Sequence, residues 1–508
     1  MTPRMVCFLS VDAGTTASKV ALFKQDGELL ASSTREYELI TPSPLEVEID
    51  AETLWRAFTS GVHDVLESGV RPDDIKAIGI SAQGETLIPV DSEAKPLRRA
   101  IVWLDSRAQN EADAINAEFD ETFYKITGQV KPSPTWPASK ILWLKRHEPA
   151  TFEKASKYIL VEDYLIHRMT GKFVSEGSLL CSTTYWDIRT RKWWDEMLDF
   201  VGITADQLPE VRESAEPIDT LLARPSEDLG LARSTLVCTG ALDQAAGAVG
   251  VGNVHAGLFS ENTGAALAIS APLEELKMDP KRKMPIHYFA KPGTYMVHSF
   301  TTGGMVLRWF RDKFCQSEMD IATSKGLDPY DVISTDAAKV PPGSEGLVML
   351  PHLQGAMAPE SNPRAKGVFY GFTLHHTKAH FVRAIMESTA CTVRRNIEAL
   401  HDMGIEIDEI RALGGGAKSK LWKQIESDLT GKPVVITTSQ SEACLGAAIL
   451  SGKAAGIFKS VDEACEKMIQ TKARFTPNIN NFGTYDELYR KYTRLYEDLC
   501  GLFSEEKN

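Results

Sequence analysis

The sequence lacks closely spaced cysteines. Its eight cysteines are scattered over 508 residues, with neither a Cys-x-x-Cys pair nor a close cysteine–histidine group. Structural zinc sites and disulfide scaffolds depend on such spacing, so neither organises this chain. Several cysteines lie in apolar runs, as Cys238 does in "STLVCTG". We therefore expect buried free thiols in a reducing compartment.

Long apolar segments and an excess of basic residues are also missing. No apolar run approaches the roughly 20 residues that cross a bilayer, and the start "MTPRMVCFLSVDAG" lacks the apolar core of a signal peptide. The formal net charge is -13, with scattered acidic residues, which argues against non-specific binding to nucleic acid or to a membrane. We expect a cytoplasmic protein whose partner is a small molecule.

What the chain does contain is an alternation of strand and helix signals, which predicts an α/β fold. The segments "VCFLSV", "KVALF" and "LLASST" predict a β-meander with polar turns between the strands. A similar phrase, "GLFSENTGAALAIS", recurs about 245 residues later. The repeat predicts two related halves, a first domain over residues 1–250 and a second over residues 251–508.

The second half also has well-marked helix signals. Residues 375–404 predict an amphipathic helix with Gly404 as its C-cap. Residues 419–431 predict a second helix, with Ser419 as N-cap and Gly431 closing it.

The first turn, "DAGTTASK", offers a site for phosphates. Thr15, Thr16 and Ser18 supply hydroxyls and amides and Lys19 a charge, while Asp12 at the strand end is suited to Mg²⁺. The turn lacks the Walker A pattern, and alone it reads more readily as a plain hairpin. The second turn, "ENTGAA", in the matching half favours two loops that meet across a cleft.

Two further segments suit chemistry. Asp243 is the only acid in "CTGALDQAAGAVGVG", and spacing alone leaves a helix cap and a catalytic base equally open. In "LGGGAKSKLW" three glycines end a strand and lead into a helix, which lets a ligand approach the backbone closely. Lys418 and Ser419 would then reach a ribose or a phosphate.

Taken together, these segments resemble the FGGY family of carbohydrate kinases, with xylulokinase-like and glycerol kinase-like members nearest. The resemblance also rests on "AIVWLDSRA", "TTGGMVLRWFRD" and "GVFYGFTLHHTKAHFVRAIMEST". It implies two actin-like, ribonuclease H-like domains around an interdomain cleft. It also implies Mg²⁺- and ATP-dependent phosphorylation of a sugar or polyol hydroxyl. Dimers are common in the family, so a homodimer is compatible with the resemblance.

The resemblance assigns roles residue by residue. Asp243 looks like the catalytic base, and Asp12 looks like the residue that positions Mg²⁺. With Ser18 and Lys19 of the first turn included, the expected ATP-binding residues are Thr15, Thr16, Ser18, Lys19, Thr263, Gly264, Gly304, Leu307, Arg308, Gly415, Gly416 and Ala417.

The stretch "GISAQGETLIPVD" corresponds to the acceptor site. After the glutamine, the glycerol kinase-like pattern has Arg-Glu and the xylulokinase pattern ends in Met-His; here the frame is Gln83-Gly84-Glu85. Gly84 predicts room for an acceptor larger than glycerol, and Glu85 is suited to two hydroxyls. An acid such as gluconate would need a nearby cation. We therefore expect a ketopentose such as xylulose, or a related C4–C5 polyol or ketose.

Further acceptor candidates follow from position. Trp103 and Asp105 match a motif that lines the sugar side, and Gln244 matches the glycerol kinase-like pattern. Trp136 is equally suited to stacking on a sugar and to a place in the core. Glu48 resembles an acid near the cleft, but a solvated acidic loop explains it as well.

Two other classes of function compete with a kinase. An actin-type or chaperone-type ATPase module shares the two phosphate turns but has no metabolite acceptor. A catalytically inactive sugar-binding regulator is disfavoured because Asp12, Thr15 and Asp243 are all retained.

Overall fold

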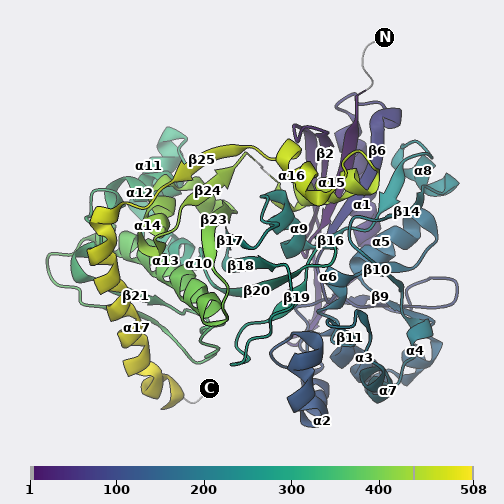
Figure 1. Cartoon of the computed structure of the whole chain (residues 1–508), viewed down its shortest axis with the longest axis horizontal. Helices are drawn as coiled ribbons and strands as arrows, with labels where there is room; N and C mark the ends of the chain where they lie inside the picture. Colours follow the sequence, from purple (N-terminus) through teal and green to yellow (C-terminus); the bar gives the residue numbers. More distant parts are fainter. Residues whose placement is uncertain (1–4, 439–440, 506–508) are drawn as a thin grey trace.

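Two seven-stranded sheets form the centres of two domains in a computed structural model of the chain (Figure 1), which describes residues 5–438 and 441–505. The first sheet has the order β14-β15-β6-β1-β2-β3, with β16 paired to β6. The second has the order β19-β20-β18-β17-β23-β24-β25.

The strands of the first sheet are β1 (Cys7–Ala13), β2 (Ala17–Lys24), β3 (Leu29–Glu36), β6 (Ile75–Ala82), β14 (Pro217–Thr220), β15 (Leu236–Cys238) and β16 (Ala241–Leu242). Those of the second are β17 (Gly257–Thr263), β18 (Ala266–Leu273), β19 (Ile286–Tyr288), β20 (Tyr295–Thr302), β23 (Ile407–Leu413), β24 (Val434–Thr437) and β25 (Thr471–Phe475).

The two sheets share one topology. Strands β1, β2 and β3 form an antiparallel meander, and β6 and β15 extend the sheet in parallel beside β1. In the second sheet β17, β18 and β20 form the meander, and β23 and β24 extend it in parallel. The internal repeat in the sequence therefore corresponds to two copies of one sheet, and the predicted two-domain α/β fold is confirmed.

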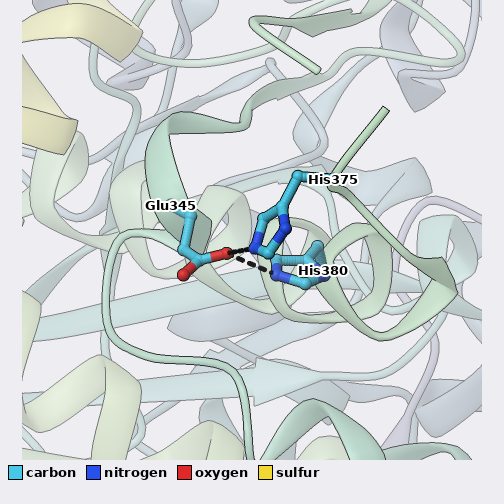
Figure 2. A group of neighbouring side chains, drawn as sticks. All are labelled: Glu345, His375 and His380. Carbon is cyan, nitrogen blue, oxygen red and sulfur yellow. Dashed lines mark hydrogen bonds and ion pairs between the residues drawn. The ribbon is translucent and has the colours of Figure 1, made fainter. Parts of the chain in front are cut away.

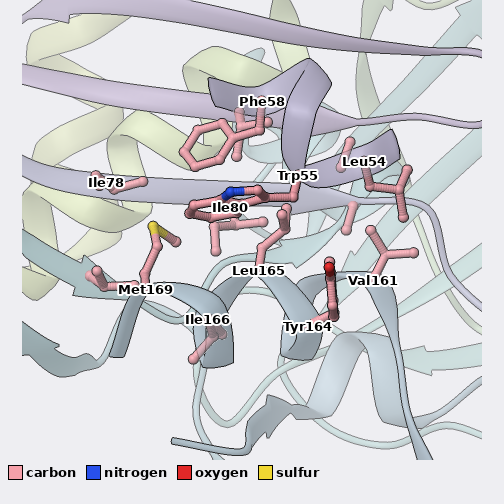
Figure 3. Close-up of a cluster of buried hydrophobic side chains, with 14 of the residues drawn as sticks. Leu54, Trp55, Phe58, Ile78, Ile80, Val161, Tyr164, Leu165, Ile166 and Met169 are labelled. Carbon is pink, nitrogen blue, oxygen red and sulfur yellow. The ribbon is translucent and has the colours of Figure 1, made fainter. Parts of the chain in front are cut away.

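Strand β6 is buried on both faces, which explains its continuous apolar sequence. Ile78 and Ile80 pack between helices α1 (Ala51–Leu66) and α5 (Val161–Thr170), as Figure 3 shows. The helices contribute Leu54, Trp55, Phe58, Val161, Tyr164, Leu165, Ile166 and Met169. This packing fixes the end of β6, where the acceptor segment begins.

Helix α15 (Glu442–Ala454) crosses from the second half of the sequence to pack on the first sheet, beside α9 (Asp243–Gly250) (Figure 1). The two helices touch through small residues. A Cβ added at Gly446 of α15 would lie 1.8 Å from the Ala246 carbonyl oxygen of α9. Helix α15 also lies close to strand β6, since a Cβ added at Gly79 would lie 2.0 Å from the Ala447 carbonyl oxygen. Glycine is therefore required for this close approach between the domains.

Shorter sheets and further helices complete the fold. The small sheets pair β4 (Ile40–Ser43) with β5 (Glu46–Ile49) and β8 (Ala100–Ile101), β7 (Ile88–Val90) with β9 (Lys157–Ile159), β10 (Val174–Glu176) with β13 (Glu210–Arg212), β11 (Trp186–Asp187) with β12 (Lys192–Trp193), and β21 (Val348–Pro351) with β22 (Gly367–Tyr370). The remaining helices are α2 (Gln109–Thr127), α3 (Pro137–His147), α4 (Pro149–Lys154), α6 (Gly177–Leu180), α7 (Asp195–Val201), α8 (Ala223–Leu229), α10 (Met305–Phe314), α11 (Gln316–Lys325), α12 (Pro329–Ala337), α13 (Lys378–Asp402), α14 (Lys420–Thr430), α16 (Val461–Met468) and α17 (Phe482–Glu505).

The predicted helices of the second half are present. Helix α13 begins at Lys378, three residues later than predicted, because Thr377 and His380 form a capping box there. Helix α14 begins after Ser419, whose hydroxyl accepts a hydrogen bond from the Trp422 amide, as predicted. All eight cysteines are free thiols, and no helix within the described residues is long and apolar enough to cross a membrane.

Candidate active site

The carboxyl ends of three parallel strands meet at one edge of the first sheet. Strands β1 and β16 both pair in parallel with β6, with Asp12 opposite Ser81 and Leu242 opposite Ala82. Side chains at and just beyond these ends therefore come together. They are Asp12, Glu85 and Asp243, and the structure thus brings the predicted metal, acceptor and catalytic residues to one place.

Asp12 lies at the end of β1, where Ser81 donates a hydrogen bond of 2.8 Å to its Oδ1. Burial raises the pKa of this carboxyl, and the Ser81 hydrogen bond and the charge of Lys19 oppose the rise. A half-buried carboxylate at a strand end suits a divalent cation, which would compensate its charge.

Asp243 is the first residue of α9, and its Oδ1 accepts a hydrogen bond of 2.6 Å from the Gln244 amide. The N-cap of the helix is Leu242, so Asp243 is not the capping residue itself, although its carboxylate binds an amide of the first turn and lies near the other two carboxylates. Burial raises its pKa to about 7, and the charges of Asp12 and Glu85 add to the rise. A carboxylate with a pKa near neutral is suited to general base catalysis.

Glu85 has a left-handed backbone conformation, with φ of 60°. Lys140 of α3 stabilises this segment, because its Nζ donates to the carbonyl oxygens of Glu85 (2.7 Å), Val102 (3.0 Å) and Ile101 (3.3 Å). Burial raises the pKa of the Glu85 carboxyl and lowers that of Lys140 to about 7. Within the described residues, Lys140 is the cationic side chain beside Glu85, and its ammonium donors are directed to backbone oxygens.

Gln83 and Gly84 differ from the expected acceptor wall. Gln83 is buried, and its Nε2 donates to the Gly14 carbonyl at 2.9 Å while its Oε1 accepts from Thr86 at 3.0 Å. A Cβ added at Gly84 would lie 2.8 Å from Cδ1 of Leu242. Gln83 therefore ties the acceptor segment to the first turn, and the end of the Leu242 side chain borders the space beside Gly84.

Trp103 links the acceptor segment to the phosphate turn, since its indole nitrogen donates to the Thr15 hydroxyl at 2.7 Å. Asp105 is fully buried, and its carboxylate accepts from the Val47 amide at 2.6 Å and pairs with Arg107. Arg107 also pairs with Glu48. Asp105 and Glu48 thus belong to a buried ion-pair network, so Glu48 does not lie in a solvated loop.

The other two acceptor candidates are partly exposed. Trp136 precedes α3, packs against the core of this domain, and donates from its indole nitrogen to the Lys131 carbonyl at 3.3 Å. Gln244 lies in the first turn of α9 beside Asp243.

The first phosphate turn connects β1 to β2. Thr16 is exposed at its tip, and Thr15 and Lys19 are half-buried. Ser18 is instead buried, and its hydroxyl has no hydrogen-bond partner among the described residues. Thr15 and Thr16 are thus the hydroxyls best placed to meet a phosphate from this side.

The second turn is packed against two other predicted nucleotide segments. The Gly304 amide donates to the Gly264 carbonyl at 2.9 Å, which joins the turn to the start of α10. A Cβ added at Gly416 would lie 2.6 Å from Cβ of Thr263. Gly414, which begins the glycine turn after β23, has φ of +79°. The glycine turn therefore needs glycine for its conformation as well as for space.

The remaining predicted nucleotide residues are divided between surface and core. Leu307 and Ala417 are buried and pack in hydrophobic clusters. Arg308 is exposed, with its Nε 3.8 Å from an oxygen of Asp312, and Gly415 is exposed in its turn. Leu307 therefore supports α10 from within the core.

Comparison with known proteins identifies the family of the chain. The sequence model described as "FGGY family of carbohydrate kinases, N-terminal domain" matches residues 7–250, and its C-terminal counterpart matches residues 273–455. The chain belongs to the FGGY family of carbohydrate kinases. It is a carbohydrate kinase with two actin-like domains.

Individual relatives of this FGGY kinase differ in their named substrates. A gluconokinase of Bacillus subtilis is 31% identical over 96% of both chains. A xylulose kinase of Escherichia coli is 30% identical over 98% of this chain and all of its own length. The crystal structure of a xylulose kinase from Lactobacillus acidophilus superposes with a TM-score of 0.88 at 27% identity, covering 98% of this chain and 99% of its own.

Residues that the sequence did not indicate hold the segment before Asp243 in this FGGY kinase. The Gly240 amide donates to Glu162 Oε1 at 2.7 Å. The Leu242 amide donates to the Ser178 hydroxyl at 3.0 Å, which in turn donates to Glu176 at 2.6 Å. Two buried carboxylates thus fix the backbone just before Asp243. Their place was not predictable because isolated acidic residues in a sequence usually indicate a solvated surface.

A separate polar cluster lies in the second domain, where His375 Nε2 and His380 Nε2 both contact Oε2 of Glu345, at 2.7 and 2.9 Å (Figure 2). The three residues have the composition of a metal site. However, the Thr377 amide donates to Nδ1 of His380, so the neutral ring carries its proton on Nε2. That nitrogen donates to Glu345 and has no lone pair for a cation, so we assign the cluster to hydrogen bonding.

Proposed function

We propose that this kinase transfers the γ-phosphoryl group of ATP to a hydroxyl of a small neutral sugar or polyol. The preferred acceptor is a ketopentose such as xylulose, or a related C4–C5 polyol or ketose. The observation that carries the proposal is the meeting of Asp12, Glu85 and Asp243 at one sheet edge, with the pKa of each carboxyl raised.

This charge distribution supports a neutral acceptor. Three neighbouring carboxylates repel an anion, whereas they accept hydrogen bonds readily from hydroxyl groups. Lys140, which lies beside Glu85, uses its three donors on backbone carbonyls and has none left for an acidic substrate. Because the B. subtilis relative is named a gluconokinase, gluconate is the alternative acceptor to test.

In the proposed reaction Glu85 orients the acceptor through its hydroxyls, and Asp243 accepts the proton of the attacking hydroxyl as the new oxygen–phosphorus bond forms. The turns around Thr15 and Thr263 position the phosphates through backbone amides, and the glycine turn at residues 414–416 accepts the adenosine. Asp12 is the residue that would hold Mg²⁺. When bound, the ion supplies neutralisation of the phosphate charge.

An ATPase of the actin or chaperone type is the alternative to a metabolite kinase. Such a module would hydrolyse ATP at a rate independent of polyols. Asp243, which lies near Glu85, favours a kinase. A general base that deprotonates an alcohol has no role in an enzyme without an alcohol acceptor.

The test is ADP release from ATP and Mg²⁺ with a panel of glycerol, tetritols, erythrulose, ribulose, D- and L-xylulose and gluconate. We expect a neutral C4–C5 compound to stimulate ADP release at least tenfold, and gluconate to have little effect. A Glu85→Gln variant should raise the KM for the acceptor and leave that for ATP unchanged. Stimulation by gluconate alone would contradict the acceptor class, and no stimulation by any compound would favour the ATPase.

A further inference from the structure

A buried charged cluster lies directly behind the second phosphate turn. Glu261 projects from β17, two residues before Thr263, and Lys423 and Glu426 project from α14. All three side chains are at most 2% exposed. Lys423 pairs with both carboxylates, so the cluster joins the strand that carries the turn to the helix that follows the glycine turn.

The charges in this cluster do not balance. Two carboxylates share one ammonium group, and Oε1 of Glu426 has no hydrogen-bond partner in the parts of the chain that the structure describes. A buried negative charge without a partner is unfavourable, so the cluster favours keeping one proton. Burial and the charge of Glu426 raise the pKa of Glu261 to about 8, and Lys423 opposes the rise. Glu426 and Lys423 are the charged groups that act on Glu261 within the described structure.

The cluster reaches the nucleotide side through one hydroxyl. Thr263 Oγ1 donates to Oε2 of Glu261, while the Thr263 backbone leads into Gly264 at the tip of the turn. The Thr263 side chain also lies against Gly416 of the glycine turn. A hydroxyl that donates to Glu261 presents only lone pairs to an incoming phosphate, which is itself rich in lone pairs.

We propose that Glu261 is a positioning residue for ATP, which orients the Thr263 hydroxyl by holding or releasing a proton. With the proton on Oε2, Glu261 donates to Thr263 Oγ1, and the hydroxyl proton of Thr263 is then available to a phosphate oxygen. When Glu261 is ionised, Thr263 donates back to it, and the phosphate loses this hydrogen bond. The proposal rests on the proposed place of Thr263 in the ATP site.

The test is the Kd for ATP with Mg²⁺, measured by calorimetry without acceptor between pH 7 and pH 9.5. A hydrogen bond to a charged group is worth about a tenfold change in Kd, so we expect the wild-type Kd to rise roughly tenfold over this range. In Glu261→Gln the amide oxygen faces Lys423 and the NH₂ group donates to Thr263. This variant mimics the protonated state and should bind ATP with a Kd that stays constant over the range.

Two further variants separate this role from a purely structural one. Glu426→Gln leaves Glu261 paired one to one with Lys423, so Glu261 should be ionised already at pH 7 and the Kd about tenfold weaker than wild type there. Thr263→Val should bind weakly at every pH. Thermal melts establish that each variant is folded.

Equal pH dependence in the wild type and in Glu261→Gln would overturn the proposal, and so would wild-type affinity in Thr263→Val. A failure of the proposed function gives a different result. In that case neither the wild type nor any variant would bind ATP at any pH, and the proposed role of Glu261 would be wrong together with the proposed function.

Discussion

Replacing Asp243 with asparagine tests the catalytic site most sharply, because the change affects rate and stability in opposite directions. Asparagine keeps the shape of the side chain and can still accept the 2.6 Å hydrogen bond from the Gln244 amide. It cannot accept the proton of an alcohol. General base catalysis commonly contributes about 10²–10⁴ in rate, so we expect kcat to fall by that factor. The Kd for ATP should change little.

The stability effect follows from the pKa of Asp243. Folding raises this pKa from 3.8 to about 7, so the folded state favours the protonated acid. The stability that this group contributes is complete below pH 4 and is lost as the pH rises through 7. At about 1.4 kcal/mol per pKa unit, the loss at pH 8 is at most about 4 kcal/mol, an upper bound because the side chain keeps some contact with solvent. Asp243→Asn should therefore unfold at a higher denaturant concentration than wild type at pH 8, with the difference vanishing near pH 4.

The same ionisation predicts the pH profile. A base must be unprotonated, so kcat/KM for the acceptor should rise with pH and level off above about 7, with roughly one tenth of the maximum at pH 6. The assay is coupled ADP release, with urea unfolding of both proteins at pH 5 and pH 8. Near wild-type turnover in Asp243→Asn, or a variant less stable than wild type at pH 8, would refute the assignment.

Three other substitutions test the packing around the site. Gly84→Arg should destabilise the protein only slightly in urea unfolding, because its Cβ would meet the movable end of the Leu242 side chain at 2.8 Å, and it should shift activity toward smaller acceptors; an unchanged acceptor profile would mean that this stretch does not line the pocket. Lys140→Met should leave the Glu85 carbonyl oxygen without its partner, whereas the Ile101 and Val102 carbonyls keep the Leu87 and Asp105 amides as donors. We expect a cost of roughly 1–3 kcal/mol in urea unfolding and a larger rise in the KM for the acceptor than in the KM for ATP; equal effects on both KM values would argue against a local role. Gly446→Ala should lower the Tm and the kcat, since its Cβ would lie 1.8 Å from the Ala246 carbonyl oxygen. A wild-type Tm in a thermal melt and a wild-type kcat in steady-state kinetics would mean that helices α9 and α15 separate easily.

Much of the fold was predictable from local patterns. The glycine- and threonine-containing turns after Asp12 and after Asn262 indicated two matching meanders, and both are present with one topology. The apolar faces of residues 378–402 and 420–430, with their caps, predicted two helices to within a few residues. These features depend on neighbours in the sequence, which is why a single chain reveals them.

Features that depend on distant contacts were not predictable. The side chain that borders Gly84 comes from Leu242, on another strand, and nothing in the sequence near Gly84 indicates it. Asp105 suggested a sugar contact, but its side chain is fully buried, with Oδ1 accepting from Arg107 and Oδ2 from Arg107 and the Val47 amide. The places of Lys140, Glu162 and Glu261 in buried networks were missed for the same reason, since charged residues in a sequence predict solvent exposure unless their partners are known.

We propose that this FGGY kinase phosphorylates a neutral sugar or polyol with Asp243 as the base. The most direct measurement is mass spectrometry of the acceptor panel after incubation with ATP, Mg²⁺ and either wild type or Asp243→Asn. We predict a phosphorylated C4–C5 ketose or polyol with the wild type and almost none with the variant. Phosphogluconate as the sole product, or equal yields from the two proteins, would contradict the claim.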